Sequence, residues 1–533
     1  MNKWFFTFFF LLWGNNLLFS QQLLIPLNRP INLPYENKFN QNSINFHTTS
    51  KPFVLSDVNY VFNSDSIVYK ERNKVYKTKL KQYLWRKLRK ESFIVVDSTD
   101  FYLTINPLFN FEIGKNLVSD SFAYVNTRGL LIQGNIGKYF SFSTSFYENQ
   151  ARFVNYVNDY INVTNVVPGQ GPVKSFKTND FDYSSASGYI SCKPIKHLNI
   201  QLGHGKSFFG EGYRSLLLSD NAFNYPYLKF TTEFKKIQYT TMYTSFINNV
   251  SRTFVSEFPK KYATFHFLSY NINTRFNVSF FESTIWQSTK NNQPKTYSFE
   301  YLNPVIFLPA AIYKLNDSNN VMLGLNMKYK LFNKFALYAQ LAIDDFKSLK
   351  NNTNFHQKIA YQFGAKGFDI FTIQNLNLIV EYNQASPYTY AYENPAQNYS
   401  HYNQSLAHPL GANFKETIGI LNFRYNDFFM EVKINYALYG DDTLNSNYGK
   451  NIFYAENTNN NGPIILGNTL LQGIKTTLLI KDIRLVYLVN PATNFNLLLG
   501  ISDRQVSSAL LKKNSLYLYF GIRTSLTNFY YDF

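Results

Sequence analysis

Hydrophobic and polar residues alternate along much of the chain from residue 102 onward. Between 428 and 438 apolar side chains occupy every second position, and Glu431, Lys433 and Asn435 lie between them. The stretches 321–330 and 335–343 have the same period. Strict alternation over about ten residues, with charges on one face only, is typical of a membrane-spanning strand that contacts lipid on its other face.

This criterion predicts eighteen strands. They are expected at 102–114, 127–136, 139–148, 183–192, 198–205, 226–234, 237–246, 262–270, 275–286, 321–330, 335–343, 357–365, 375–383, 414–425, 428–438, 472–489, 495–503 and 515–525. Short connections alternate with long ones such as 149–182, 206–225, 287–320, 384–413 and 439–471. This asymmetry predicts an all-β fold, a transmembrane antiparallel β-barrel with short periplasmic turns and long external loops.

The C-terminal stretch continues the alternation. Leu516, Leu518, Phe520 and Ile522 share one face, and Phe529, Tyr531 and Phe533 alternate after them. An aromatic residue at the end of an alternating strand resembles the signature that barrel-insertion machinery recognises in outer-membrane proteins.

The first residues have the features of a secretory signal peptide. Lys3 precedes a largely apolar stretch from Trp4 to Trp13, and Ser20 supplies a small residue before Gln21. The apolar stretch is too short to span a bilayer, so we expect cleavage near Ser20 and export. Beyond residue 20, no uncharged apolar run approaches the ~18 residues of a membrane helix, which excludes a helical membrane protein.

Residues 21–100 are expected to form a short, partly helical periplasmic segment before the barrel at 101–533. Pro26, Pro30 and Pro34 interrupt an extended leader, and residues 77–91 have the pattern of a basic amphipathic helix. Its apolar stripe consists of Leu80, Tyr83, Leu84 and Leu88. Such a helix lies on an anionic membrane surface or binds a partner. The alternative is a helix packed on the rest of the protein with its basic face in solvent.

Composition narrows the classes of function further. Lys and Arg number 52 against 34 Asp and Glu, a net charge of +18, and 18% of the residues are aromatic. Because the protein is expected to be exported and its basic residues are spread, we expect no nucleic-acid partner; anionic lipid headgroups or acidic surface glycans suit the charge better. The single cysteine, Cys192, excludes an intrachain disulfide and a cysteine-based zinc site.

The sequence contains no recognised enzyme motif. Lys206 and Ser207 follow Gly205 as in a phosphate-binding loop, but Ile200 stands where that motif requires glycine. The HExxH and GxSxG motifs are absent, and the seven histidines have no metal-ligand spacing. We therefore expect a protein that is not an enzyme and has no cofactor or metal.

Two loop segments differ from plain strand-and-turn sequence. Segment 203–230 has four glycines and candidate polar contacts at Arg214, Asp220 and Asn221. Segment 381–416 is rich in tyrosine, and its candidate contact residues are Tyr388, Tyr390, His401, Tyr402 and His408. Aromatic rings stack on sugar faces while amide and imidazole groups bond to hydroxyls, so these residues suit a glycan. Alternatively, the segments are loops that fold into the lumen and plug it. Both follow strands that run outward, so we expect them to meet at the external end of the barrel.

Residues 203–228 resemble the capsule-assembly (Wzi-like) family of outer-membrane barrels, which carries a glycine-rich turn and a Ser-x-Asn-Ala stretch. Ser219, Asn221 and Ala222 match that stretch, and Phe209 stands where the family pattern has Trp. The chain resembles the gliding-motility RemB-like proteins of Bacteroidota more closely. Supporting stretches lie at 166–171, 300–304 and 381–416, so the resemblance covers roughly residues 100–533.

The resemblance implies a barrel in the outer membrane of a Gram-negative bacterium, involved in gliding motility or in attachment of surface polysaccharide (capsule). The expected partners are outer-membrane lipid and lipopolysaccharide, surface polysaccharide, and other envelope or motility proteins. The alternative is a passive porin for small solutes. A porin needs an open water path, whereas loop 206–225 and helix 77–91 are candidates to close it.

Overall fold

The computed structural model describes residues 22–63, 78–177, 179–248, 260–290, 293–294, 302–308, 319–344, 358–443, 446–455, 468–524 and 527–533. The predicted signal peptide lies outside these residues. Among the described helices, none is both long enough and apolar enough to cross a membrane.

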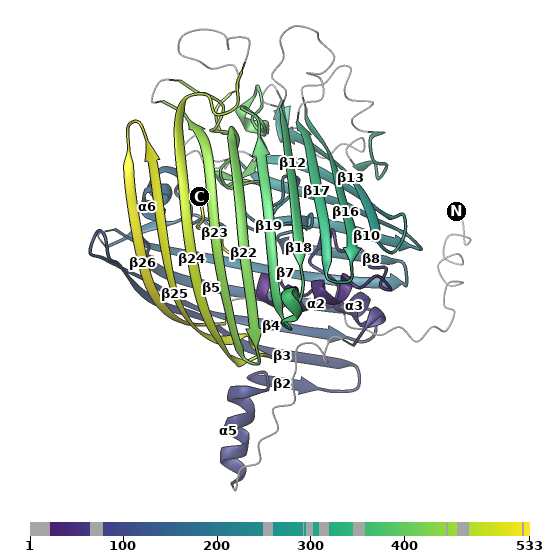
Figure 1. Cartoon of the computed structure of the whole chain (residues 1–533). Coiled ribbons are helices and arrows are strands. Elements are labelled where there is room, and N and C mark those ends of the chain that lie inside the picture. Colours follow the sequence, from purple (N-terminus) through teal and green to yellow (C-terminus); the bar gives the residue numbers. More distant parts are fainter. Residues whose placement is uncertain are drawn as a thin grey trace.

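Eighteen antiparallel strands of the described chain close into one barrel (Figure 1). They are β3 (Phe101–Asn116), β4 (Ser121–Ile136), β5 (Phe140–Arg152), β7 (Asp180–Ile195), β8 (Leu198–Gly205), β10 (Tyr225–Phe234), β11 (Ile237–Ile247), β12 (Lys260–Asn271), β13 (Phe276–Gln287), β16 (Asn320–Phe332), β17 (Phe335–Asp344), β18 (Ile359–Gly367), β19 (Leu376–Ala385), β22 (Phe414–Tyr425), β23 (Phe428–Asp441), β24 (Ile474–Asn490), β25 (Phe495–Ser508) and β26 (Lys512–Arg523). Pairing of β26 with β3 closes the ring, from Tyr517 opposite Asn116 to Arg523 opposite Asn110. Each predicted strand is present, so the prediction of an eighteen-stranded barrel is confirmed.

The two faces of the strands are also as predicted. On β23, Ile434 points outward with 51% of its surface exposed, whereas Asn435 is fully buried on the lumen side. On β16, Met327 and Tyr329 are exposed, and the alternate residues Lys328 and Lys330 are buried. The outward face therefore presents apolar side chains to lipid, and the inward face carries charge.

Residues 22–63 lie inside the barrel, which differs from the predicted periplasmic segment. They include the helices α2 (Arg29–Phe39) and α3 (Leu55–Val61) and a two-residue strand, β1 (Ser50–Lys51), that pairs with β9 (Phe208–Phe209). Helix α2 begins at Arg29 because the Asn28 side chain accepts a hydrogen bond from the backbone N–H of Ile31. Its contacts with lumen-facing strand residues, such as Arg29 with Glu431, hold it in the barrel.

The last residues also turn into the lumen instead of extending β26. That strand ends at Arg523, and the Thr524 backbone N–H still donates to Phe109 O. The ladder stops there because Pro107, nearby on β3, has no N–H to continue it. The Tyr531 carbonyl accepts from Tyr156, on the helix α6 (Asn155–Thr164). The alternating aromatics at 529, 531 and 533 therefore lie beyond the last strand, in a tail that enters the lumen.

Loop residues and strand residues share the largest apolar core. Phe209 stacks on the lumen-facing Phe267 with ring centres 4.6 Å apart, and Leu216, Leu217 and Leu218 are fully buried in the same cluster. A second set of loop residues, from Tyr388 to Ala412, completes it. This part of the lumen is thus packed like the interior of a soluble protein.

Candidate functional site

The loop between β8 and β10 carries Arg214 into the middle of the lumen. One guanidinium nitrogen, Nη2, donates to Glu416 Oε1 and to the Asp532 backbone oxygen, both at 3.0 Å. The other, Nη1, lies 3.1 Å from Asp532 Oδ1, close enough for an ion pair but not aligned as a hydrogen bond. All three side chains are at most 3% exposed, so their charges must be satisfied by one another.

Asp532 is the acceptor that joins this loop to the C-terminal tail and to β23. Its Oδ2 accepts from Tyr213 at 2.6 Å and from Lys433 at 2.8 Å. Burial alone would raise the pKa of Asp532, but Arg214 and Lys433 outweigh burial and hold that pKa well below its usual range. The carboxylate is therefore ionised at any physiological pH.

Asp220 and Asn221 are buried as well, and each has a partner in another segment. Asp220 accepts from Tyr530 at 2.7 Å and from Asn528 at 3.0 Å. The Asn221 side chain donates to Ser405 O at 2.9 Å. These two residues therefore bind the first loop to the C-terminal tail and to the second loop.

The second loop, residues 386–413, lies directly against the first. Tyr390 OH donates to Leu216 O at 2.8 Å, and Tyr388 OH donates to Asn447 O at 2.7 Å. His408 donates through Nε2 to Glu416 Oε2 at 2.7 Å, because its Nδ1 accepts from the Leu410 N–H. Burial lowers the pKa of His408, although Glu416 opposes that shift.

His401 and Tyr402 lie beside the end of β11. His401 Nδ1 accepts from the Ile247 N–H at 3.0 Å, and its Nε2 therefore donates to Asn224 O at 3.0 Å. Tyr402 packs edge-on against the His401 ring at 4.8 Å and is partly exposed. The two predicted loops thus form one assembly, in which all the candidate residues except Tyr402 are buried.

A third group of contacts fixes the N-terminal segment to the barrel wall and to the first loop. Glu36 accepts from Lys51 and from Lys366 on β18, each at 2.7 Å. Glu211 accepts from Thr48 and, at 3.2 Å, from Lys328. Burial alone would raise the pKa of Glu36, but the two lysines lower it far below its usual range. No local pattern in the sequence predicts these contacts, because most of the partners are distant along the chain.

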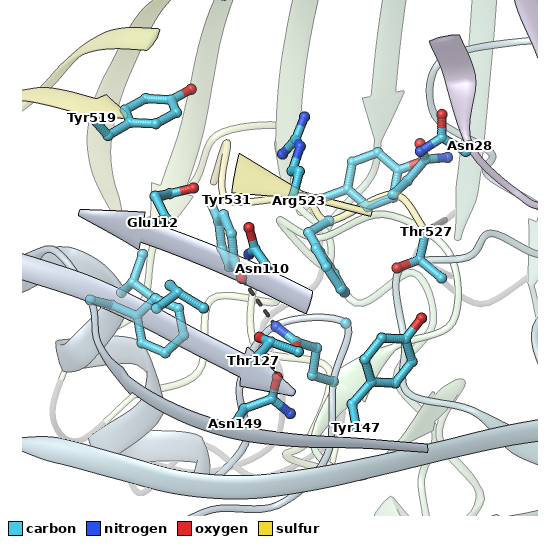
Figure 2. A pocket seen from close by; sticks show the side chains of 18 of the residues that line it. Asn28, Asn110, Glu112, Thr127, Tyr147, Asn149, Tyr519, Arg523, Thr527 and Tyr531 are labelled. Carbon is cyan, nitrogen blue, oxygen red and sulfur yellow. Dashed lines mark hydrogen bonds between the residues drawn. The ribbon is translucent and has the colours of Figure 1, made fainter. Parts of the chain in front are cut away.

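Between this packed assembly and one wall of the barrel lies a cavity of about 240 Å³ (Figure 2). The wall consists of β3 to β7 and β23 to β26, and the tail at 527–531 forms the opposite side. Figure 2 shows labelled side chains that converge on this space from several strands: Asn110 and Glu112 from β3, Thr127 from β4, Tyr147 and Asn149 from β5, and Tyr519 and Arg523 from β26. None of the eight predicted contact residues lines this cavity.

The cavity combines aromatic rings with incompletely bonded polar groups. The Arg523 side chain donates one long bond, 3.3 Å, to Asn496. Asn110 Oδ1 is buried and accepts no hydrogen bond within the described residues. Gln170 reaches the cavity and donates to Tyr531 OH at 3.1 Å. Ring faces beside free donors and acceptors are the arrangement that holds a saccharide.

The alternation of the strands indicated which of these residues face the lumen, but not which of them the plug leaves uncovered.

Among the described residues, no group of three or more His, Cys, Asp or Glu side chains is placed to hold a metal ion.

Comparison with known proteins finds similarity in structure alone. No protein-family profile matches the sequence, and no curated protein matches it. Wzi, an outer membrane protein of Escherichia coli involved in group 1 capsule assembly and described as a carbohydrate-binding β-barrel, aligns with a TM-score of 0.58 at 12% identity. The alignment covers 94% of this chain and 98% of Wzi. The OprD barrel of Pseudomonas aeruginosa aligns with a TM-score of 0.43 at 10% identity over 83% of this chain and 100% of OprD. The alignment with Wzi shows that the chain has the fold of a Gram-negative outer-membrane barrel.

Proposed function

We propose that this protein is a non-enzymatic, plugged outer-membrane barrel that attaches polysaccharide at the cell surface. The cavity lined by Tyr147, Arg523 and Asn110 is the observation that carries this proposal, because it offers rings and available polar groups within an otherwise filled lumen. The likeness in shape to a carbohydrate-binding barrel, over nearly the whole of both chains, supports it.

The cavity favours an acidic sugar over a neutral one. Arg29, Arg152, Arg484 and Arg523 lie in its lining together with Lys206, against the carboxylates of Glu112, Glu431 and Asp482. Arg484 lies 2.7 Å from Asp482, and Arg152 lies 2.5 Å from Asp180. Within the described residues, the Arg523 side chain donates a single hydrogen bond, the long one to Asn496. Arg523 is therefore the cation best placed to bind a sugar carboxylate.

The eight residues first considered as glycan contacts have a different role in this proposal. The polar groups of seven of them bond to other buried side chains or to backbone, and Tyr402 covers His401; the seven are Arg214, Asp220, Asn221, Tyr388, Tyr390, His401 and His408. We assign them to the plug. A plug of this kind argues against the alternative, a passive porin, because the described loops, the N-terminal segment and the tail occupy the water path.

Binding of the purified protein to polysaccharide extracted from the surface of its own cells tests the proposal. Arg523→Gln and Tyr147→Ala should each weaken binding roughly tenfold, which corresponds to the loss of one charge-assisted hydrogen bond or one stacked ring. Tyr425→Ala removes a tyrosine of similar size from the outer face, where it is 66% exposed, and should leave binding unchanged. Equal affinities for all three variants would contradict the cavity as the site.

A strain that lacks the protein tests the biological role. We expect it to release surface polysaccharide into the medium. The resemblance to gliding-motility proteins adds a second expectation, loss of gliding on a surface. Retention of polysaccharide together with normal gliding would contradict the proposal.

A further inference from the structure

Helix α5 (Lys79–Arg89) lies outside the barrel and buries none of its residues. Figure 1 shows it beyond the short-turn ends of the strands, apart from the plug. Leu80, Tyr83, Leu84 and Leu88 form its apolar stripe, and each is 50–67% exposed. The alternative of a helix packed on the protein by its apolar face is therefore wrong.

The helix contacts the barrel through other residues. Arg89 donates to Tyr487 OH at 2.8 Å and lies over the ring of that residue. Asn490 donates to the Lys87 and Glu91 carbonyls, at 3.0 and 2.9 Å, and so satisfies acceptors at the C-terminal end of the helix. These contacts fix one end of α5 to the barrel rim.

The attachment point belongs to the lipid-facing surface. Tyr487 follows Ile483 and Leu485 on the outward face of β24, and its ring lies 4.9 Å from that of Phe428, which is 61% exposed. Outward-facing aromatic rings near the strand ends are typical of the girdle at a membrane–water interface. Helix α5 therefore starts from the edge of the bilayer, on the side of the short turns.

The charge of the helix is wholly positive. It carries Lys79, Lys81, Arg86, Lys87 and Arg89, Lys90 follows, and no acidic residue occurs between Lys79 and Lys90. Glu91 pairs with Arg86 at 3.2 Å and with Lys87 at 3.4 Å. An apolar stripe flanked by cations is the pattern that binds an anionic lipid surface.

The chain after the helix adds to the same exposed surface. Phe93 is 61% exposed, and the short strand β2 (Ile94–Asp97), which pairs with β3, exposes Ile94, Val95 and Val96 by 41–43% each. These apolar side chains lie between the helix and the barrel strands in sequence, so they extend the apolar surface from α5 toward the lipid-facing wall.

We propose that α5 is an interfacial anchor that binds the anionic phospholipid of the periplasmic leaflet. In the bound state the stripe from Leu80 to Leu88 enters the headgroup region, and the lysines contact lipid phosphates. The helix turns about its attachment at Asn490 and lies along the leaflet. Because α5 precedes the first barrel strand, β3, the anchor holds the chain that enters the barrel wall at the membrane surface. This proposal does not depend on polysaccharide binding.

A fluorescent label on the stripe tests the anchor. In a Cys192→Ser background, Leu84→Cys carries an environment-sensitive nitrobenzoxadiazole label, and the full chain is placed in nanodiscs of phosphatidylcholine with or without phosphatidylglycerol. We expect phosphatidylglycerol to shift the emission to the blue and to raise it roughly twofold, and lipids with a spin label on the acyl chain to quench it. The matched control is Arg86→Cys, whose native side chain is 47% exposed on another side of the helix and whose label should stay in water.

Charge removal separates the anchor from a folding effect. Lys79→Gln with Lys81→Gln should abolish the response to phosphatidylglycerol, while heat-modifiable gel migration shows that the barrel is still folded. Identical spectra of the Leu84→Cys label in both lipids, without quenching by the spin-labelled lipid, would overturn the proposal. A water-like spectrum would then mean that the helix is free in solution, and a blue-shifted spectrum that protein covers the stripe.

Discussion

Arg214 and Asp532 form an ion pair 3.1 Å long in the middle of the barrel lumen. Arg214 comes from the loop after β8, and Asp532 from the tail that follows the last strand. Glu416 and Lys433 extend the pair to β22 and β23. A single buried network therefore ties a loop, the tail and the barrel wall together.

Breaking this network should destabilise the plug strongly. We expect Arg214→Met to cost about 3–5 kcal/mol, because it leaves Glu416 and Asp532 buried without their principal cation. The midpoint of urea unfolding, followed by gel migration and by fluorescence, measures the loss. The double variant Arg214→Met with Asp532→Asn should cost less than the sum of the two single changes. Simple additivity would contradict the coupling of the two side chains.

Charge on the lipid face should impair assembly of the barrel. Leu499 is 47% exposed on the outward face of β25, beside Leu485 on β24. Leu499→Arg should cost up to about 4 kcal/mol, because a charge on the lipid face must enter the hydrocarbon layer. Ser502→Arg, on the same strand but facing the cavity, is the matched control and should assemble normally. The yield of heat-modifiable protein in outer membranes measures both, and equal yields would contradict the assignment of the two faces.

The structure changes which residues are suitable for this comparison. The alternation alone predicts that arginine impairs assembly far more at Ile434, on the lipid face, than at Asn435, on the lumen face. Asn435 is instead fully buried and donates to Glu416 at 2.9 Å, so a larger cation there would disrupt the plug. Ile434 lies opposite Lys481, and Lys481 pairs with Asp503 on the outward face. The surroundings of Ile434 are therefore already charged. Asn435 is therefore unsuitable as the neutral control for Ile434.

Acid should weaken the plug through His401. Burial lowers the pKa of His401 to about 3, and the nearby cations Lys261 and Lys206, with His204, add to that shift, while its bond to the Asn224 carbonyl opposes it. When the pKa of a histidine is lower in the folded protein than in the unfolded chain, the folded protein loses stability as pH falls below the unfolded-chain pKa, about 6.5. Protonation of Nδ1 would also remove the acceptor of the Ile247 N–H.

The midpoint of urea unfolding as a function of pH measures this effect. We expect the free energy of unfolding to fall by about 1.4 kcal/mol per pH unit from this one group between pH ~6 and pH ~4. His401→Asn should remove that slope while the contributions of other titrating groups remain. The same slope in the variant and in the native protein would contradict the assignment to His401.

The strands could be predicted from sequence because lipid on one face imposes the alternation on each strand locally. Ile434 and Asn435 show this, since the period of two is enough to assign their faces. The plug could be predicted only in part. The two loops were recognised by composition, but the partners of the first loop, Asp532, Lys328 and Thr48, lie more than a hundred residues away from it in sequence. The cavity was missed because its lining depends on where the plug ends, and local sequence does not encode this.

Single-channel recording in planar bilayers tests the central claim, a closed lumen, most directly. The intact protein should show negligible conductance, because both loops, the N-terminal segment and the tail occupy the lumen. Deletion of residues 207–218 removes Arg214 and the apolar residues Phe209 and Leu216–Leu218, and it should produce open channels. Large, stable conductance of the intact protein would contradict the plugged barrel and would favour a passive porin.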